Sequence, residues 1–149
     1  MVVLTLFIPL IISSGGNSGS QAATLVIRAM ALGELRLRDF WRVLRREFGS
    51  GLLLGGFLAL IGIAQVVLGH YVFHGYGDQP GRLALTVALS LVGVVTWGTV
   101  CGSMLPILLR RAGFDPASAS APFVATLVDV VGLVIYFSIG RAVLIGGLV

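Results

Sequence analysis

The sequence predicts an all-α integral membrane protein with about four transmembrane helices, and three observations lead to this fold class. Of the 149 residues, 57% are hydrophobic and only 11% are charged, whereas about 25% of residues are charged in a typical soluble domain. The apolar residues gather in four stretches, each long enough to cross a bilayer at about 20 residues per crossing. The arginines cluster between those stretches. We therefore expect one multi-pass transmembrane domain over residues 1–149, located in the cell membrane.

Four predicted spans divide the chain into helices and short loops. They cover residues 2–31, 49–68, 83–109 and 121–147. The first span contains a run of glycines and short polar residues between residues 13 and 21. Non-helical backbone at membrane depth is tolerated only where protein buries it or where it lines a cavity. We therefore expect the first helix to be broken by its glycines and to be buried or pore-lining.

An arginine-rich connector, residues 32–48, joins the first two spans. Every basic residue in the chain is an arginine, and five of them fall between residues 36 and 46. Apolar side chains recur among these arginines at helical spacing, which predicts an amphipathic helix lying at the interface in contact with membrane lipid. Residues 110–111 add two arginines, whereas residues 69–82 contain one. By the positive-inside rule, the first and third loops face the cytoplasm.

Asp129 is the most informative residue of the fourth span. An ionised carboxylate inside a transmembrane helix costs at least about 2.5–3.5 kcal/mol, so it persists only with a cation, a water-filled cavity or a proton. Pro122 and Thr126 flank Asp129 along the helix, and Ala125 and Gly132 leave space beside it. Small residues of this kind also leave backbone carbonyl oxygens near a bound cation.

The chemistry of these residues leaves three interpretations of Asp129 open. Mg²⁺ prefers oxygen ligands and gives up water reluctantly, so it suits one or two carboxylates with retained water. Two copies of Asp129 on a symmetry axis would form the charged ring of a cation-selective pore. The second interpretation is a proton relay in a proton-coupled secondary transporter. The third is a structural carboxylate that Arg28 or Arg141 neutralises from another span.

A polar stripe follows the first span. Asn17, Gln21, Thr24 and Arg28 recur at spacings of four, three and four residues, which places them on one face of a helix. Such a stripe serves either as hydrogen-bonding glue between packed helices or as part of a pore wall. The combination of Asn17 and Gln21 favours the pore wall.

The remaining polar residues argue against other classes of function. Asp129 has no second carboxylate, Ser–His pair or Cys–His pair in its span, so we do not expect an enzyme. The basic segments are short and lie between membrane spans, so we do not expect nucleic acid as a partner. His70, His74 and Asp78 have metal-ligand spacing, but neighbouring glycines and a proline disfavour the continuous helix that such a site needs. Cys101 is the single cysteine, which excludes an intramolecular disulfide.

Two segments resemble the MgtE magnesium transporter/channel family. The segment GGNSGSQAATLVIR, from Gly15 to Arg28, is similar to the glycine-rich signature of that family. The segment DPASASAPFVATLVDVVGLVIYF, from Asp115 to Phe137, resembles its last transmembrane helix. The two segments occur in the family's order, and the resemblance spans essentially the whole chain.

The resemblance implies a homodimeric membrane domain with a central pore for Mg²⁺ or another divalent cation. Asp129 would bind hydrated Mg²⁺, the backbone at Ala125 would face the same ion, and Asn17 would lie nearby. The resemblance also implies that the helix with the glycine-rich segment and the last helix line the pore. The predicted pore-lining residues are Gly15, Gly16, Gly19, Gln21, Thr24, Pro122, Thr126 and Gly132.

The chain also departs from the pattern of the family. Members usually carry a cytoplasmic N-terminal helical domain, a pair of CBS modules and five membrane helices. We expect this chain to lack both soluble parts and to begin at the second helix. Ala121 also stands where many members have a polar residue. The alternative to a transporter is therefore a non-transporting assembly or regulatory fragment.

Overall fold

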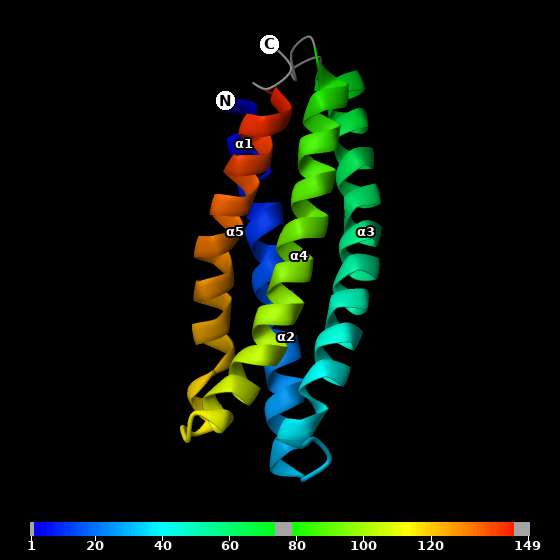
Figure 1. The fold of residues 1–149 in the computed structure, drawn as a ribbon. Coiled ribbons are helices and arrows are strands. Elements are labelled where there is room, and N and C mark those ends of the chain that lie inside the picture. Colours follow the sequence, from blue (N-terminus) through cyan, green and yellow to red (C-terminus); the bar gives the residue numbers. More distant parts are fainter. Residues whose placement is uncertain (1, 74–78, 145–149) are drawn as a thin grey trace.

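The structure, a computed structural model, describes residues 2–73 and 79–144, which form helices joined by short turns (Figure 1). Helix α4 lies between α3 and α5, and α2 packs against both α4 and α5. The elements in chain order are α1 (Val2–Thr5), α2 (Ile8–Ala31), the 3-10 helix η1 (Leu37–Asp39), α3 (Phe40–Phe73), α4 (Pro80–Arg111), the 3-10 helix η2 (Pro116–Ser118) and α5 (Ala121–Leu144).

Four stretches of the described chain are long and apolar enough to cross a membrane. They are Val3–Ala31, Leu37–Val72, Pro80–Arg111 and Ala121–Leu144. The predicted fold class is therefore confirmed. The end of the predicted fourth span, residues 145–147, lies outside the described residues, as do His74 and Asp78 of the loop with metal-ligand spacing.

The prediction that the glycines break the first helix is wrong. Helix α2 is continuous through Gly15, Gly16 and Gly19, and the interruption lies at residues 6–7, just before Pro9. Proline is favoured in the first turn of a helix, where its missing N–H costs no hydrogen bond. The glycines remain helical because the neighbouring helices pack directly on their backbone, so no carbonyl or N–H has to leave the helical ladder.

The prediction of a separate interfacial helix over residues 32–48 is also wrong. Only η1 is separate, and α3 runs without a break from Phe40 into the membrane span. Its first turns are held by tertiary packing, because Val43 is buried in a cluster with Met30, Met104 and Ile107. That cluster ties the start of α3 to the ends of α2 and α4, which sequence periodicity alone does not reveal.

Two glycines end the helices at the arginine-rich end of the molecule. Gly33 follows α2 with φ +74°, and Gly113 follows α4 with φ +85°. This left-handed conformation is the usual way to stop a helix, and glycine adopts it without a side-chain clash. The turns after α2 and α4 lie together at one end of the molecule. The start of α1 and the end of α5 lie at the other end (Figure 1).

Candidate cation site between α2 and α5

Asp129 lies on α5 directly against the backbone of α2. A Cβ atom added at Gly16 would lie 2.6 Å from Asp129 Oδ1 and 3.8 Å from the Cβ atom of Ala125. The fold therefore brings Gly16 of α2 together with Ala125 and Asp129 of α5, which lie far from it in the sequence. Asp129 and Ala125 are both half-buried, whereas Gly16 is buried. The absence of a side chain at Gly16 provides the space that the carboxylate occupies.

The carboxylate of Asp129 has one shielded oxygen. Its Oδ1 atom is buried without a hydrogen-bond partner among the described residues. Neither of the two arginines proposed as its partner neutralises it, since Arg28 and Arg141 are exposed and form no ion pair with it within the described part of the chain. Arg28 lies twelve residues after Gly16 on α2, and Arg141 lies twelve residues after Asp129 on α5. Twelve residues correspond to about 18 Å along a helix. Within one chain, neither arginine is therefore placed to neutralise Asp129.

Ser20 joins α2 to the beginning of α5. Its hydroxyl donates a hydrogen bond to the carbonyl of Gly16 at 2.8 Å and lies 3.0 Å from the carbonyl of Ala121. This second contact joins the first turn of α5 to α2, one helical turn along α2 from Gly16. Ser20 is not among the site residues predicted from the sequence. The sequence does contain a pattern that could have identified it. Ser20 directly precedes Gln21 of the polar stripe and follows Gly16 by four residues.

The polar stripe of α2 lies on the surface of the chain. Asn17, Gln21 and Thr24 are all exposed. Asn17 Nδ2 donates to Ser13 Oγ at 3.2 Å, which extends the stripe by one turn toward the start of α2. Ser20, Gln21, Thr24 and Leu25 line a shallow hollow of about 410 Å³ on this face.

Two predicted residues of α5 add to this exposed face. Pro122 and Thr126 are exposed, and Thr126 Oγ1 donates to the carbonyl of Pro122 at 3.0 Å. Thr126 thereby uses its O–H donor within its own helix, and the two lone pairs of its hydroxyl oxygen can still accept hydrogen bonds from water.

Three of the predicted pore-lining glycines pack against helices of the same chain. A Cβ atom at Gly15 would meet Val94 of α4, and one at Gly19 would lie 3.0 Å from the carbonyl oxygen of Gly98. A Cβ atom at Gly132 would lie 3.0 Å from Val94 Cγ1. These glycines set the close approach of α2, α4 and α5. That they also line a pathway stays a prediction.

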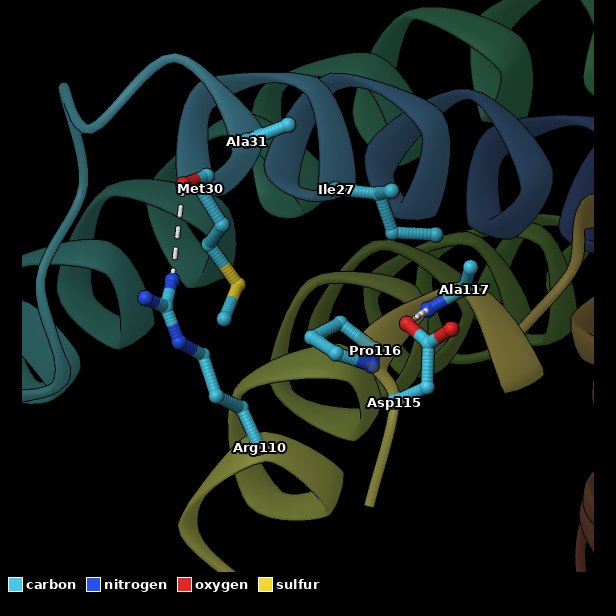
Figure 2. Close-up of a pocket in the computed structure, with 7 residues that line it drawn as sticks. All are labelled: Ile27, Met30, Ala31, Arg110, Asp115, Pro116 and Ala117. Carbon is cyan, nitrogen blue, oxygen red and sulfur yellow. Dashed lines mark hydrogen bonds between the residues drawn. The ribbon is translucent and has the colours of Figure 1, made fainter. Parts of the chain in front are cut away.

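A second hollow, of about 350 Å³, lies at the arginine-rich end and is separate from Asp129. Figure 2 shows Arg110 reaching from α4 toward the end of α2, where its Nη1 atom donates to the carbonyl of Met30 at 3.4 Å. On the other side of the hollow, the N–H of Ala117 donates to Asp115 Oδ1 at 2.9 Å. Arg110 thus ties the end of α4 to the end of α2, whereas Asp115 stabilises the start of η2, in the loop that leads into α5.

The donor set of the candidate site is poor in strong metal ligands. Within residues 2–73 and 79–144, no group of three or more His, Cys, Asp or Glu side chains is placed to hold a metal ion. Among the described residues, the candidate site offers one carboxylate, that of Asp129, beside amide, hydroxyl and carbonyl oxygens. Such a set suits an ion that keeps much of its hydration shell, because few protein ligands then have to replace water.

Comparison with known proteins places these features in a family. Residues 8–139 match the MgtE family, described as divalent cation transporters. The chain belongs to the MgtE family. The prediction drawn from the glycine-rich and Asp129 segments is thereby confirmed, as is the prediction of a multi-pass membrane protein. The expectation that the chain is not an enzyme is confirmed as well, since the MgtE family is one of transporters.

Individual MgtE relatives match the chain along nearly its whole length. It is 44% identical over 144 residues to a protein named magnesium transporter MgtE from Thermus thermophilus. The alignment covers 97% of this chain and 30% of that protein. A protein of the same name from Bacillus subtilis is 32% identical, with 95% of this chain and 30% of the relative covered. One from Enterococcus faecalis is 31% identical, with 92% and 28% covered. The chain thus spans under a third of the length of these relatives.

Proposed function

We propose that this chain forms a pathway for Mg²⁺ across the membrane, in which two copies face each other through α2 and α5. The observation that carries the proposal is the Asp129 carboxylate, which lies in a helix long and apolar enough to cross a membrane and beside an exposed polar face. Three relatives that match more than nine-tenths of the chain are named magnesium transporters, which supports Mg²⁺ as the transported ion.

The two sides of the molecule have different surfaces, and this supports the arrangement of the two copies. The outward face of α3 exposes large apolar side chains such as Leu53, Phe57 and Leu60, which suit contact with lipid. The exposed face of α2 presents Asn17 and Gln21 instead. Polar groups at membrane depth face protein or a water-filled cavity rather than lipid. A second copy related by two-fold symmetry presents the same polar face and encloses the pathway between them.

The number and kind of oxygen ligands favour hydrated Mg²⁺. Two copies supply two Asp129 carboxylates, which together balance the charge of one divalent cation. Mg²⁺ loses its water reluctantly and is commonly held by one or two carboxylates with several waters retained. The carbonyl oxygen at Ala125 and the amide of Asn17 are then partners for the bound waters. In this arrangement Asp129 selects for charge and for the size of the hydrated ion.

Two alternatives make different use of the same residues. In a proton-coupled secondary transporter, Asp129 is a proton relay, and its shielded Oδ1 atom is the observation in favour of that function. In a non-transporting assembly or regulatory fragment, the exposed polar face of α2 binds a longer relative instead of a second copy.

Reconstitution of the whole chain into liposomes that contain a Mg²⁺-sensitive dye separates these functions. We expect the chain to carry Mg²⁺ inward and the Asp129→Asn variant to lose that flux. The matched control is Glu34→Gln, which removes an exposed carboxylate from the turn after α2 and should leave the flux unchanged. Equal flux in both variants would contradict the proposal.

Two further readouts identify the alternatives. A Mg²⁺ flux that follows an imposed pH gradient at constant Mg²⁺ gradient would favour the proton relay. A chain that carries no Mg²⁺ but co-purifies with a full-length relative would favour the assembly fragment.

A further inference from the structure

An open hollow lies on α3 at the arginine-rich end of the molecule. Trp41, Arg42 and Arg45 line it, and its volume is about 420 Å³. All three side chains are exposed, Trp41 to 70%. Neither arginine forms a side-chain hydrogen bond or an ion pair within the described part of the chain. Two guanidinium groups are therefore available on one turn of helix, beside an aromatic ring.

Apolar side chains continue along α3 beyond the residues that line the hollow. Phe48 follows Arg45 by three residues, and Leu52 follows Phe48 by four, so all three lie on the same face of α3. Phe48 and Leu52 are 51% and 42% exposed. Because α3 packs mainly against α4, this face is left open to the surroundings. The surface thus changes from cationic to apolar along one stripe, in the direction from the cytoplasmic end into the membrane.

We propose that this hollow binds the headgroup of an anionic phospholipid, with its acyl chains lying along Phe48 and Leu52. Arginine guanidinium groups form paired hydrogen bonds with phosphate oxygens, and tryptophan favours the headgroup level of the bilayer. The cytoplasmic leaflet carries the anionic lipids that attract arginines near its surface. The site is separate from Asp129, so it stands or falls independently of the proposed pathway.

Charge and surface continuity favour a lipid over other occupants. A second copy of this chain that docked through the same hollow would bring four unpaired arginines together, which is unfavourable. A soluble phosphate compound would satisfy the arginines but would leave the adjoining apolar stripe uncovered. A phospholipid satisfies both parts, because its phosphate and its acyl chains are covalently joined.

Tryptophan fluorescence offers a direct test, since the chain has only two tryptophans. In a Trp97→Phe variant of the whole chain, Trp41 is the sole fluorophore. The protein is placed in phosphatidylcholine vesicles that contain a minor fraction of phosphatidylglycerol. The bromine quencher is carried on the acyl chains of one lipid or of the other. We expect the quenching of Trp41 by brominated phosphatidylglycerol to correspond to an enrichment of that lipid beside Trp41 of about fivefold or more over its fraction in the vesicle. The reason is that one arginine near the surface favours an anionic lipid by about that factor.

Paired variants then locate the site. Arg42→Gln with Arg45→Gln should bring the enrichment to within about twofold of unity, as expected from the loss of both surface charges. The control, Arg38→Gln with Arg111→Gln, removes the same charge at exposed positions outside the hollow and should keep the enrichment.

Three results would overturn the proposal. The first is equal quenching by the two brominated lipids in the Trp97→Phe protein, which needs no arginine variant to interpret. The second is equal loss of enrichment in both paired variants, which would indicate a diffuse basic surface. The third is full competition by free glycerol 3-phosphate, which would indicate a soluble phosphate site instead of a lipid site.

Discussion

Asp129 Oδ1 lies so close to Gly16 that a Cβ atom at that glycine would be 2.6 Å away. The glycine of one helix thus determines where the carboxylate of another can sit. In the proposed Mg²⁺ pathway Gly16 is a positioning residue, because its missing side chain leaves the space that the Asp129 carboxylate occupies.

The Gly16→Ala substitution should therefore displace the Asp129 carboxylate while the fold persists. We expect the Mg²⁺ concentration for half-maximal flux to rise about tenfold or more, as when the support of a metal-binding carboxylate is altered. Liposome flux measured over a Mg²⁺ series checks this. The control is Gly56→Ala on α3, where an added Cβ atom has no neighbour within 4 Å. Unchanged Mg²⁺ dependence in Gly16→Ala would show that the carboxylate position does not limit transport.

Ser20 provides a second test of how α5 is held against α2. Ser20→Ala removes the contact with the carbonyl of Ala121 and should lower the free energy of unfolding by about 0.5–1.5 kcal/mol. Ser18→Ala is the matched control, because within the described residues the Ser18 hydroxyl bonds only to the carbonyl of Ser14 in its own helix. Chemical denaturation in detergent micelles compares the two. Equal stability of both variants would mean that the Ser20 contact with Ala121 contributes nothing.

The crossing of α2 and α4 depends on glycines in both helices. A Cβ atom at Gly102 would collide with the carbonyl oxygen of Gly19, and a backbone atom cannot turn aside as a side chain can. Gly102→Ala should therefore lower the free energy of unfolding by about 1–3 kcal/mol. Gly93→Ala on the same helix meets only side-chain atoms at 3.4 and 3.9 Å, so its stability should stay within about 1 kcal/mol of the parent. A similar result for both would contradict the close crossing.

Tyr136 links α5 to the short helix α1. Its buried hydroxyl donates to the carbonyl of Leu4 at 2.8 Å. Tyr136→Phe should lower the free energy of unfolding by about 0.5–1.5 kcal/mol and speed hydrogen exchange of the α1 amides. Tyr71→Phe, at an exposed tyrosine, should change neither. Unaltered exchange in α1 after Tyr136→Phe would show that packing alone holds this helix.

Cross-linking tests the proposed pairing of two copies. In a Cys101→Ser background, Asn17→Cys puts the single thiol on the polar face of α2, and Phe57→Cys puts it on the apolar face of α3. A bifunctional thiol reagent applied to membranes should yield a covalent dimer with the first variant and monomer with the second. Dimer formed only by the α3 variant would place the contact between copies on the opposite side of the molecule.

The sequence by itself determined the membrane class, the four spans and the family. Hydropathy depends on composition over about twenty residues, so it is readable without contacts. The Asp129 carboxylate was identifiable for the same reason, since its cost in an apolar span follows from the local sequence. The polar stripe of α2 followed from helical spacing, and Asn17, Gln21 and Thr24 do share an exposed face.

Only the tertiary structure decided which of these residues meet. A glycine run predicts either a broken helix or a close helix contact, and the choice depends on what packs against it. Here α4 and α5 fill the space beside Gly15, Gly16 and Gly19, so the helix continues through them. The same applies to α3, whose first turns are held by Val43 packing on residues of α2 and α4. The contact of Gly16 with Asp129 joins residues 113 positions apart. A pattern within one helix spans only neighbouring residues, so it does not predict this contact.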